Sequence, residues 1–117
     1  MLKIRKRDDS FEEFDIAKIK NAIERAFAAE HKFYNDEIID MLALRVVSDF
    51  NNKIKDSEVG VEDIQDSVEI VLIQSGYVDV AKSYMVYRKQ HQNLRDLKTT
   101  NIDYKNVINN YLKINDW

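Results

Sequence analysis

The scarcity of helix-breaking residues constrains this chain more than any other feature. Its 117 residues include no proline, and its two glycines are Gly60 and Gly76. Proline and glycine are the residues that most often end helices and form turns. A β-sandwich or a β-barrel needs many turns and would normally contain more of both. The sequence therefore predicts a mainly helical α+β fold.

The first fourteen residues differ from the rest and predict a small β-hairpin. Residues 2–7 alternate weakly between apolar and basic side chains, and residues 11–14 form a second short extended piece. Between them, Asp8-Asp9-Ser10 offers turn chemistry, because these side chains hydrogen-bond their own backbone. Two isolated strands are only marginally stable in water. We therefore expect the hairpin to pack on the helices.

Beyond the hairpin, apolar residues recur three or four positions apart, as in amphipathic helices. Asp15 is suited to N-cap the first helix, and Gly76 to end the third. Residues 58–61 are either a third strand or an extended lead-in. The other segments that this pattern predicts are a second helix beginning near Asn35 and Asp36, a polar connection over 51–57, a third helix over 62–74, a fourth over 78–98, a break at 99–101, and a short fifth helix over 103–114.

Composition excludes several kinds of chemistry. The chain has no cysteine, which removes disulfides, thiolate nucleophiles and cysteine-ligated metals. His31 and His91 have no ligand-spaced partner, so we interpret them as a surface and a half-buried structural residue, with no catalytic residue among them. The longest apolar run is four residues, which predicts no membrane partner and a cytoplasmic protein. The net charge of −3 argues against direct nucleic-acid binding.

Binding of phosphate would require cationic side chains, because the glycine-rich loops that cradle phosphates are absent. Lysine meets a phosphate as a point charge and arginine as a bidentate fork. The candidate phosphate ligands are Lys3, Arg5, Lys6, Arg7, Lys18, Arg88 and Lys89. On charge alone, we favour the simpler interpretation that these are solvated surface residues that balance the acidic residues of the chain.

A series of short motifs adds information through its order. The motifs are Lys6-Arg-Asp-Asp-Ser10, Phe14-Asp15, Lys18-Ile19, Ala22-Ile23, Val61-Glu-Asp-Ile-Gln-Asp66, Val68-Glu69, Gly76-Tyr77, Ala81-Lys82 and Tyr87-Arg88. This series, over about residues 3–92, resembles the ATP cone, a regulatory nucleotide-binding domain of ribonucleotide reductases. The chain departs from the family pattern at Asp9, where glycine is usual. Aspartate tolerates the left-handed conformation, so we expect the turn to survive.

The resemblance implies a fold, an effector and a site. The fold is a two- or three-stranded sheet that caps a four-helix bundle, and the effector is ATP or dATP, accompanied by Mg²⁺ whose ligands it does not identify. In the family, ATP keeps the reductase active and dATP turns it off. Carried over by position, the triphosphate lies against Lys6, Arg7, Lys18, Arg88 and Lys89, Ile4 and Ile19 flank the adenine, Glu12 and Asp15 accept hydrogen bonds from base or sugar, and Val61 and Gln65 complete the pocket.

The resemblance also implies a domain organisation. Residues 1–98 would be the ATP cone, and residues 99–117 a linker and helix that lead toward a catalytic domain. The tail, residues 109–117, is similar to the segment before the catalytic domain of anaerobic, glycyl-radical ribonucleoside-triphosphate reductases. This predicts a regulatory module that is not itself an enzyme. Its expected partners are adenine nucleotides, the catalytic domain of its parent chain and, depending on nucleotide, a second copy.

Two alternatives stay open at this point. The chain could be the ATP cone of a nucleotide-sensing transcriptional regulator, although the known regulator carries a cysteine zinc ribbon that this sequence lacks. It could also be a helical protein-interaction domain that binds no nucleotide. Only the nucleotide-binding hypotheses predict a thermal shift with ATP or dATP.

Overall fold

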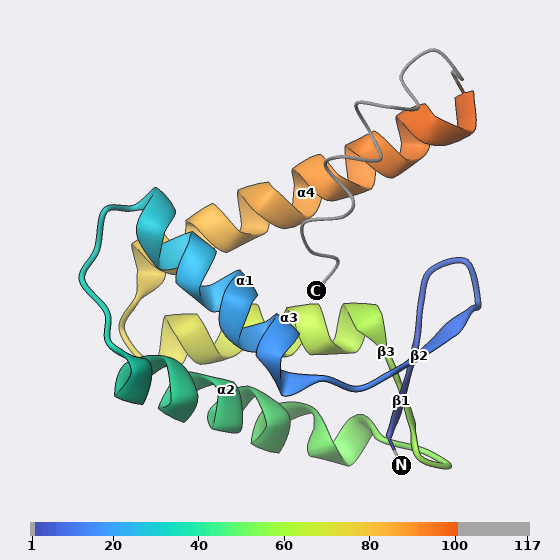
Figure 1. Ribbon diagram of the computed structural model, residues 1–117, viewed down its shortest axis with the longest axis horizontal. Coiled ribbons are helices and arrows are strands. Elements are labelled where there is room, and N and C mark those ends of the chain that lie inside the picture. The colour runs from blue at the N-terminus through green and yellow to red at the C-terminus, as the bar shows by residue number, and fades with distance from the viewer. Residues whose placement is uncertain (1, 101–117) are drawn as a thin grey trace.

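The computed structural model describes residues 2–100, as a small sheet beside a group of helices (Figure 1). The elements in chain order are β1 (Lys3–Arg5), β2 (Phe11–Glu13), α1 (Ile16–Ala29), α2 (Asp36–Phe50), the 3-10 turn η1 (Asn51–Lys53), β3 (Glu58–Gly60), α3 (Val61–Gln74) and α4 (Val78–Thr100). This confirms the predicted α+β class. Within these residues, no helix is both long enough and apolar enough to cross a bilayer.

The sheet has the order β2-β1-β3, with β1 in the centre. Strand β1 pairs antiparallel with β2, placing Ile4 opposite Glu12, and parallel with β3, placing Ile4 opposite Val59. Residues 58–60 are therefore a third strand, which decides between the two possibilities left by the sequence. Ile4 is fully buried and Val59 nearly so, which shows that the hairpin packs on the helices as expected.

The core lies where the apolar faces of the four helices meet. Phe27 of α1 is fully buried and makes edge-to-face contacts with Tyr34 and Tyr77, with ring centroids 5.8 and 5.0 Å apart. Phe14, just after β2, packs in the same manner against Phe50 at the end of α2, at 5.9 Å. These aromatic contacts join the loops and the sheet to the helices. The remaining core residues include Ile19, Ile23, Ile39, Leu42, Val46, Ile64, Val68, Leu72, Val80 and Tyr84.

The helix ends follow the predicted capping chemistry. The carboxylate of Asp15 accepts a hydrogen bond from the Ala17 amide at 3.0 Å, and Asn35 Oδ1 accepts one from Ile38 at 2.9 Å. Helix α3 ends at Gln74, and Gly76, just past the C-cap Ser75, has a φ of +88° in the left-handed region. There the Tyr77 amide donates to the Leu72 carbonyl at 2.9 Å. This is the glycine-terminated helix end that the sequence indicated.

Both strands of the hairpin are shorter than the predicted ranges 2–7 and 11–14, and two predicted helix boundaries also differ from the structure. Helix α3 begins at Val61, one residue earlier than predicted, because it follows β3 directly with Gly60 as its N-cap. Helix α4 runs through Thr100, so the predicted break does not begin at Thr99. Threonine disfavours a helix by only a few tenths of a kcal/mol, which an established helix overcomes. The predicted fifth helix, residues 103–114, lies outside the described residues.

The β1–β2 turn contains a strained residue. Asp9 has a φ of 66°, at the position where the resemblance led us to expect glycine. The turn is closed by hydrogen bonds from the Asp9 amide to the Lys6 carbonyl and from the Lys6 amide to the Ser10 carbonyl, at 3.0 and 2.8 Å. Ser10 also hydrogen-bonds the Asp8 carboxylate through its hydroxyl and its amide, which lowers the pKa of Asp8. The turn thus survives the departure from glycine.

We expect Asp9→Gly to stabilise the protein, because glycine adopts a positive φ without a steric penalty. The free energy of unfolding should rise by about 0.5–1 kcal/mol, measured by thermal or denaturant unfolding. Arg25→Gly, at an exposed position in the interior of α1, is the control and should lower stability by about 1 kcal/mol. Destabilisation by Asp9→Gly of the same size as in the control would contradict this account of the turn.

A second prediction concerns Tyr84, which is 1% exposed and whose hydroxyl has no hydrogen-bond partner among the described residues. Burial raises the pKa of this hydroxyl well above its usual range. A buried polar group without a partner is costly, so Tyr84→Phe should leave the melting temperature unchanged or raise it. Tyr84→Ala should lower stability by about 3–5 kcal/mol through the cavity it creates. A clear loss of stability in Tyr84→Phe would reveal a partner for the hydroxyl.

Candidate functional site

The first part of the site is a carboxylate held between two lysines. Glu12 lies on β2, Lys6 directly follows β1, and Lys18 lies in the first turns of α1. Lys18 Nζ is 3.3 Å from Glu12 Oε2, and Lys6 Nζ is 3.6 Å from the same oxygen. All three side chains are partly shielded from solvent, with exposed fractions of 40% or less. The hairpin and α1 therefore bring together two of the cations predicted to hold a triphosphate.

Arg7, the next residue along the chain, reaches a different element. Its Nη2 donates to Gln65 Oε1 at 3.2 Å and lies 3.5 Å from Glu62 Oε1, both on α3. Gln65 is buried, whereas the Glu62 side chain is largely exposed. Arg7 therefore links the β1–β2 loop to the first turns of α3, and it fixes the orientation of a predicted pocket residue.

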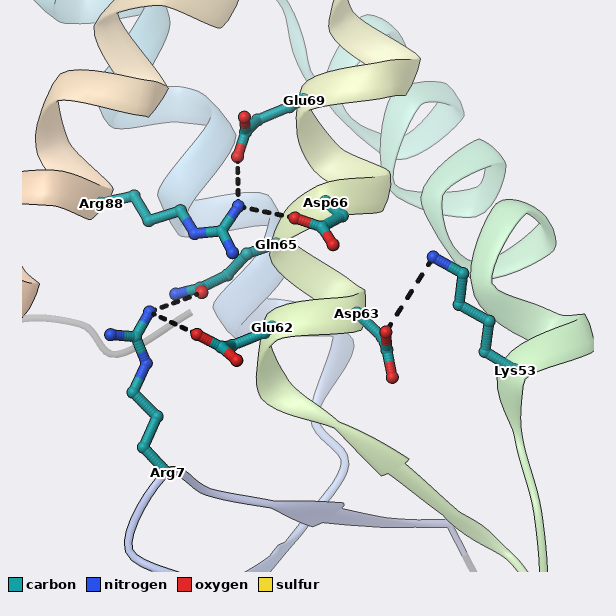
Figure 2. A network of polar contacts seen from close by, with 8 residues as sticks. All are labelled: Arg7, Lys53, Glu62, Asp63, Gln65, Asp66, Glu69 and Arg88. Carbon is teal, nitrogen blue, oxygen red and sulfur yellow. Dashed lines mark hydrogen bonds and ion pairs between the residues drawn. The ribbon is translucent and has the colours of Figure 1, made fainter.

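Arg88 on α4 reaches α3 from the other side of Gln65 (Figure 2). Its Nη1 hydrogen-bonds Asp66 Oδ1 at 2.8 Å and also Glu69 Oε2. Burial alone would lower the pKa of the Arg88 guanidinium, but its hydrogen bonds to the two carboxylates outweigh burial and raise that pKa. Arg88 therefore stays protonated, and its ion pairs link α4 to α3.

The carboxylates that pair with these arginines form one stripe of α3. Glu62, Asp66 and Glu69 are spaced by four and three residues, which places them on one helix face together with Gln65. Our sequence prediction assigned no role to these three acids. Their helical spacing was visible in the sequence, but nothing there indicated which cations they face.

Other predicted residues have different surroundings. Ile4 and Ile19 are fully buried in the core, and Val61 is 4% exposed. An adenine ring could contact the two isoleucines only after the packing between sheet and helices opens. Asp15 is exposed, but one of its carboxylate oxygens caps α1. Lys89 is exposed on α4 beside Arg88.

The described residues do not provide a metal site of their own. Across residues 2–100, no group of three or more His, Asp or Glu side chains is arranged to hold a metal ion. Glu62, Asp66 and Glu69 of α3 face arginines, and Glu12 faces lysines. These residues therefore do not fit a protein-held Mg²⁺.

A groove of about 340 Å³ between α2 and α3, lined by Arg45, Ser48, Asp49, Val71 and Gln74, contains no predicted site residue.

The arrangement suits an anionic ligand whose charge is spread over several groups. Lys6, from the loop after β1, and Lys18, from α1, lie beside the Glu12 carboxylate of β2. Arg7, from the same loop, and Arg88, from α4, lie along one face of α3. Lysine and arginine in partly shielded positions are the usual side-chain partners of phosphate groups. A ligand with a single negative charge could contact only part of this set.

Comparison with known proteins identifies the family. The model of the ATP cone domain matches residues 2–93. A ribonucleoside-diphosphate reductase subunit alpha of Chlamydia pneumoniae is 35% identical over 102 residues, covering 81% of this chain and 10% of the relative. A vitamin B12-dependent ribonucleoside-diphosphate reductase of Mycobacterium tuberculosis is 38% identical over 96 residues, covering 82% and 13%. The chain thus spans about a tenth of these relatives' length.

These findings confirm the resemblance to ATP cones and the link to ribonucleotide reductases. Both relatives are described as diphosphate reductases, so they do not support the predicted anaerobic, triphosphate-reducing class. An ATP cone is a regulatory domain, which agrees with the prediction that the chain is not an enzyme by itself. On the evidence of a match over residues 2–93, the chain belongs to the ATP-cone domain family.

Proposed function

We propose that this chain is the adenine-nucleotide sensor of a cytoplasmic ribonucleotide reductase, which ATP keeps active and dATP turns off. One observation carries the proposal: the family match covers the region in which Lys6 and Lys18 converge on Glu12. The relatives support the parent enzyme, because both named above are ribonucleotide reductases. The catalytic domain of the parent chain is then the partner that receives the signal.

In this proposal the triphosphate takes the place of the carboxylates that now neutralise the cations. Lys6 and Lys18 share Glu12, so they lie close enough together to contact neighbouring phosphate groups. Arg7 and Arg88 would extend the cationic surface along α3, with Lys89 at its outer edge. Mg²⁺ would arrive with the triphosphate and be held mainly by phosphate oxygens and water.

The base and sugar would lie toward the sheet. Ile4 and Ile19 would flank the adenine once their packing opens, with Val61 and Gln65 at the start of α3 completing the pocket. Glu12, released from its lysines, and Asp15 would accept hydrogen bonds from base or sugar. This placement follows the family resemblance, and the position of Gln65 beside Arg7 supports it.

ATP and dATP differ by one hydroxyl, which as a hydrogen bond contributes about 1 kcal/mol. A difference of that size cannot by itself reverse the state of an enzyme. The two effectors must therefore favour different arrangements of the module relative to its neighbours, such as different oligomers. We include nucleotide-dependent self-association in the proposal for this reason.

The class of the parent enzyme is a separate part of the proposal. The anaerobic, triphosphate-reducing class rests on the resemblance of residues 109–117, which lie outside the described residues. The relatives named above are diphosphate reductases. The reductase activity of the full-length parent, assayed with diphosphate and triphosphate substrates under anaerobic conditions, would decide between the two classes.

We expect ATP and dATP to bind the chain at submillimolar concentration or tighter, as measured by calorimetry. Lys6→Ala and Lys18→Ala should each weaken binding by about tenfold, because each removes a charged phosphate contact. Lys53→Ala is the matched control and should leave affinity unchanged. Lys53 pairs with Asp63 at 4.0 Å, on the side of α3 away from Arg7 and Arg88 (Figure 2).

Equal effects of all three substitutions would show that the site is placed wrongly. No heat and no thermal shift with either nucleotide would instead favour the helical interaction domain. A thermal-shift panel of ATP, dATP, GTP and buffer distinguishes a nucleotide sensor from that alternative at little cost.

A further inference from the structure

We propose that Asp66 and Glu69 compete with ligand phosphate for Arg88 and so act as an internal brake on nucleotide binding. This inference rests on the proposed function, because it concerns the control of the same site. It also assigns a role to two acidic residues that the sequence prediction left without one.

The contacts of Arg88 carry the inference. Asp66 and Glu69 both accept hydrogen bonds from Nη1, a nitrogen that has only two hydrogens. Both donors of this nitrogen are therefore engaged by carboxylates. The side chains of Arg88 and Glu69 are each 19% exposed, so water screens their interaction only in part. A phosphate can bind Nη1 only if at least one carboxylate leaves.

The charge balance points in the same direction. One guanidinium and two carboxylates have a net charge of −1, so this corner of the site repels a phosphate while the contacts persist. Elsewhere the acids do not outnumber the cations: Lys6 and Lys18 share Glu12, which leaves a net charge of +1, and Arg7 forms a neutral pair with Glu62. At Arg88 alone, acids outnumber cations among the contacts described above. The brake is therefore strongest at Arg88.

The two acids differ in how easily they can leave. The Asp66 side chain is 49% exposed and can turn into solvent at small cost, whereas Glu69 is shielded. Glu69 would thus stay near the bound phosphate and repel it more strongly than Asp66 does. Neutralising Glu69 should strengthen triphosphate binding more than neutralising Asp66.

The same contacts tie α4 to α3, because Arg88 lies on α4 and both acids lie on α3. Exchange of Arg88 from carboxylate to phosphate therefore loosens one link between these helices when ligand binds. Neutralisation of the acids should have two opposite effects: lower thermal stability without ligand and higher affinity for triphosphate. A purely structural ion pair would give only the first.

The experiment measures binding of ATP, inorganic triphosphate and adenosine by calorimetry, and melting temperature without ligand. The proteins are the wild type, Glu69→Gln, Asp66→Asn and the control Asp63→Asn. The control removes the same charge from the same helix, but Asp63 pairs with Lys53 and not with Arg88 (Figure 2). Inorganic triphosphate tests the cations without the base, and adenosine tests the base without the phosphates.

We expect Glu69→Gln to bind ATP and inorganic triphosphate about tenfold more tightly than the control, and Asp66→Asn a few-fold more tightly. Adenosine binding should not change. The melting temperature of Glu69→Gln should fall. If Glu69→Gln does not fold, the half-exposed Asp66→Asn decides the outcome.

The inference is overturned if the two variants bind triphosphate no more tightly than Asp63→Asn while the wild type binds ATP. The proposed function then stands. If neither ATP nor inorganic triphosphate binds to any of the proteins, the inference and the proposed function both fail.

Discussion

The parallel pairing of β1 with β3 is the interaction on which the rest of this structure depends. A hairpin of two three-residue strands has too little surface to be stable in water by itself. Strand β3 places Val59 opposite Ile4, and both side chains enter the helical core. Because β3 leads directly into α3, the same pairing fixes where α3 begins relative to the β1–β2 loop. The contact of Arg7 with Gln65, 58 positions away, follows from this arrangement.

The site that results is electrically balanced before any ligand binds. Lys6, Arg7, Lys18 and Arg88 face Glu12, Glu62, Asp66 and Glu69, which makes four positive and four negative charges. Such a balance lets partly shielded cations persist without an anionic ligand, since unpaired charges away from water are costly. Under the proposed function, a triphosphate must therefore displace these carboxylates from the cations in order to bind. Affinity is then set by the difference between two sets of ion pairs.

Local structure was largely predictable from the sequence. The Asp15 cap, the helix end at Gly76 and the hairpin depend on neighbours within a few residues, and all three predictions are confirmed. The third strand could not be decided, because three residues show no periodicity and their partner lies far away in sequence. The sequence also did not show which apolar residues of the predicted pocket are buried before a ligand binds. Ile4 and Ile19 were expected beside the adenine, and the structure places both in the core.

The sequence by itself determined the helical character of the chain, the family to which it belongs and the absence of thiol chemistry. These properties follow from composition, short-range periodicity and the order of motifs. Only the tertiary structure decided which charges meet. Glu62, Asp66 and Glu69 form a solvated stripe in any isolated helix, and they become partners of Arg7 and Arg88 only when β1 and α4 pack beside α3. The physical reason is that ion pairs between distant segments depend on packing, which local sequence patterns do not encode.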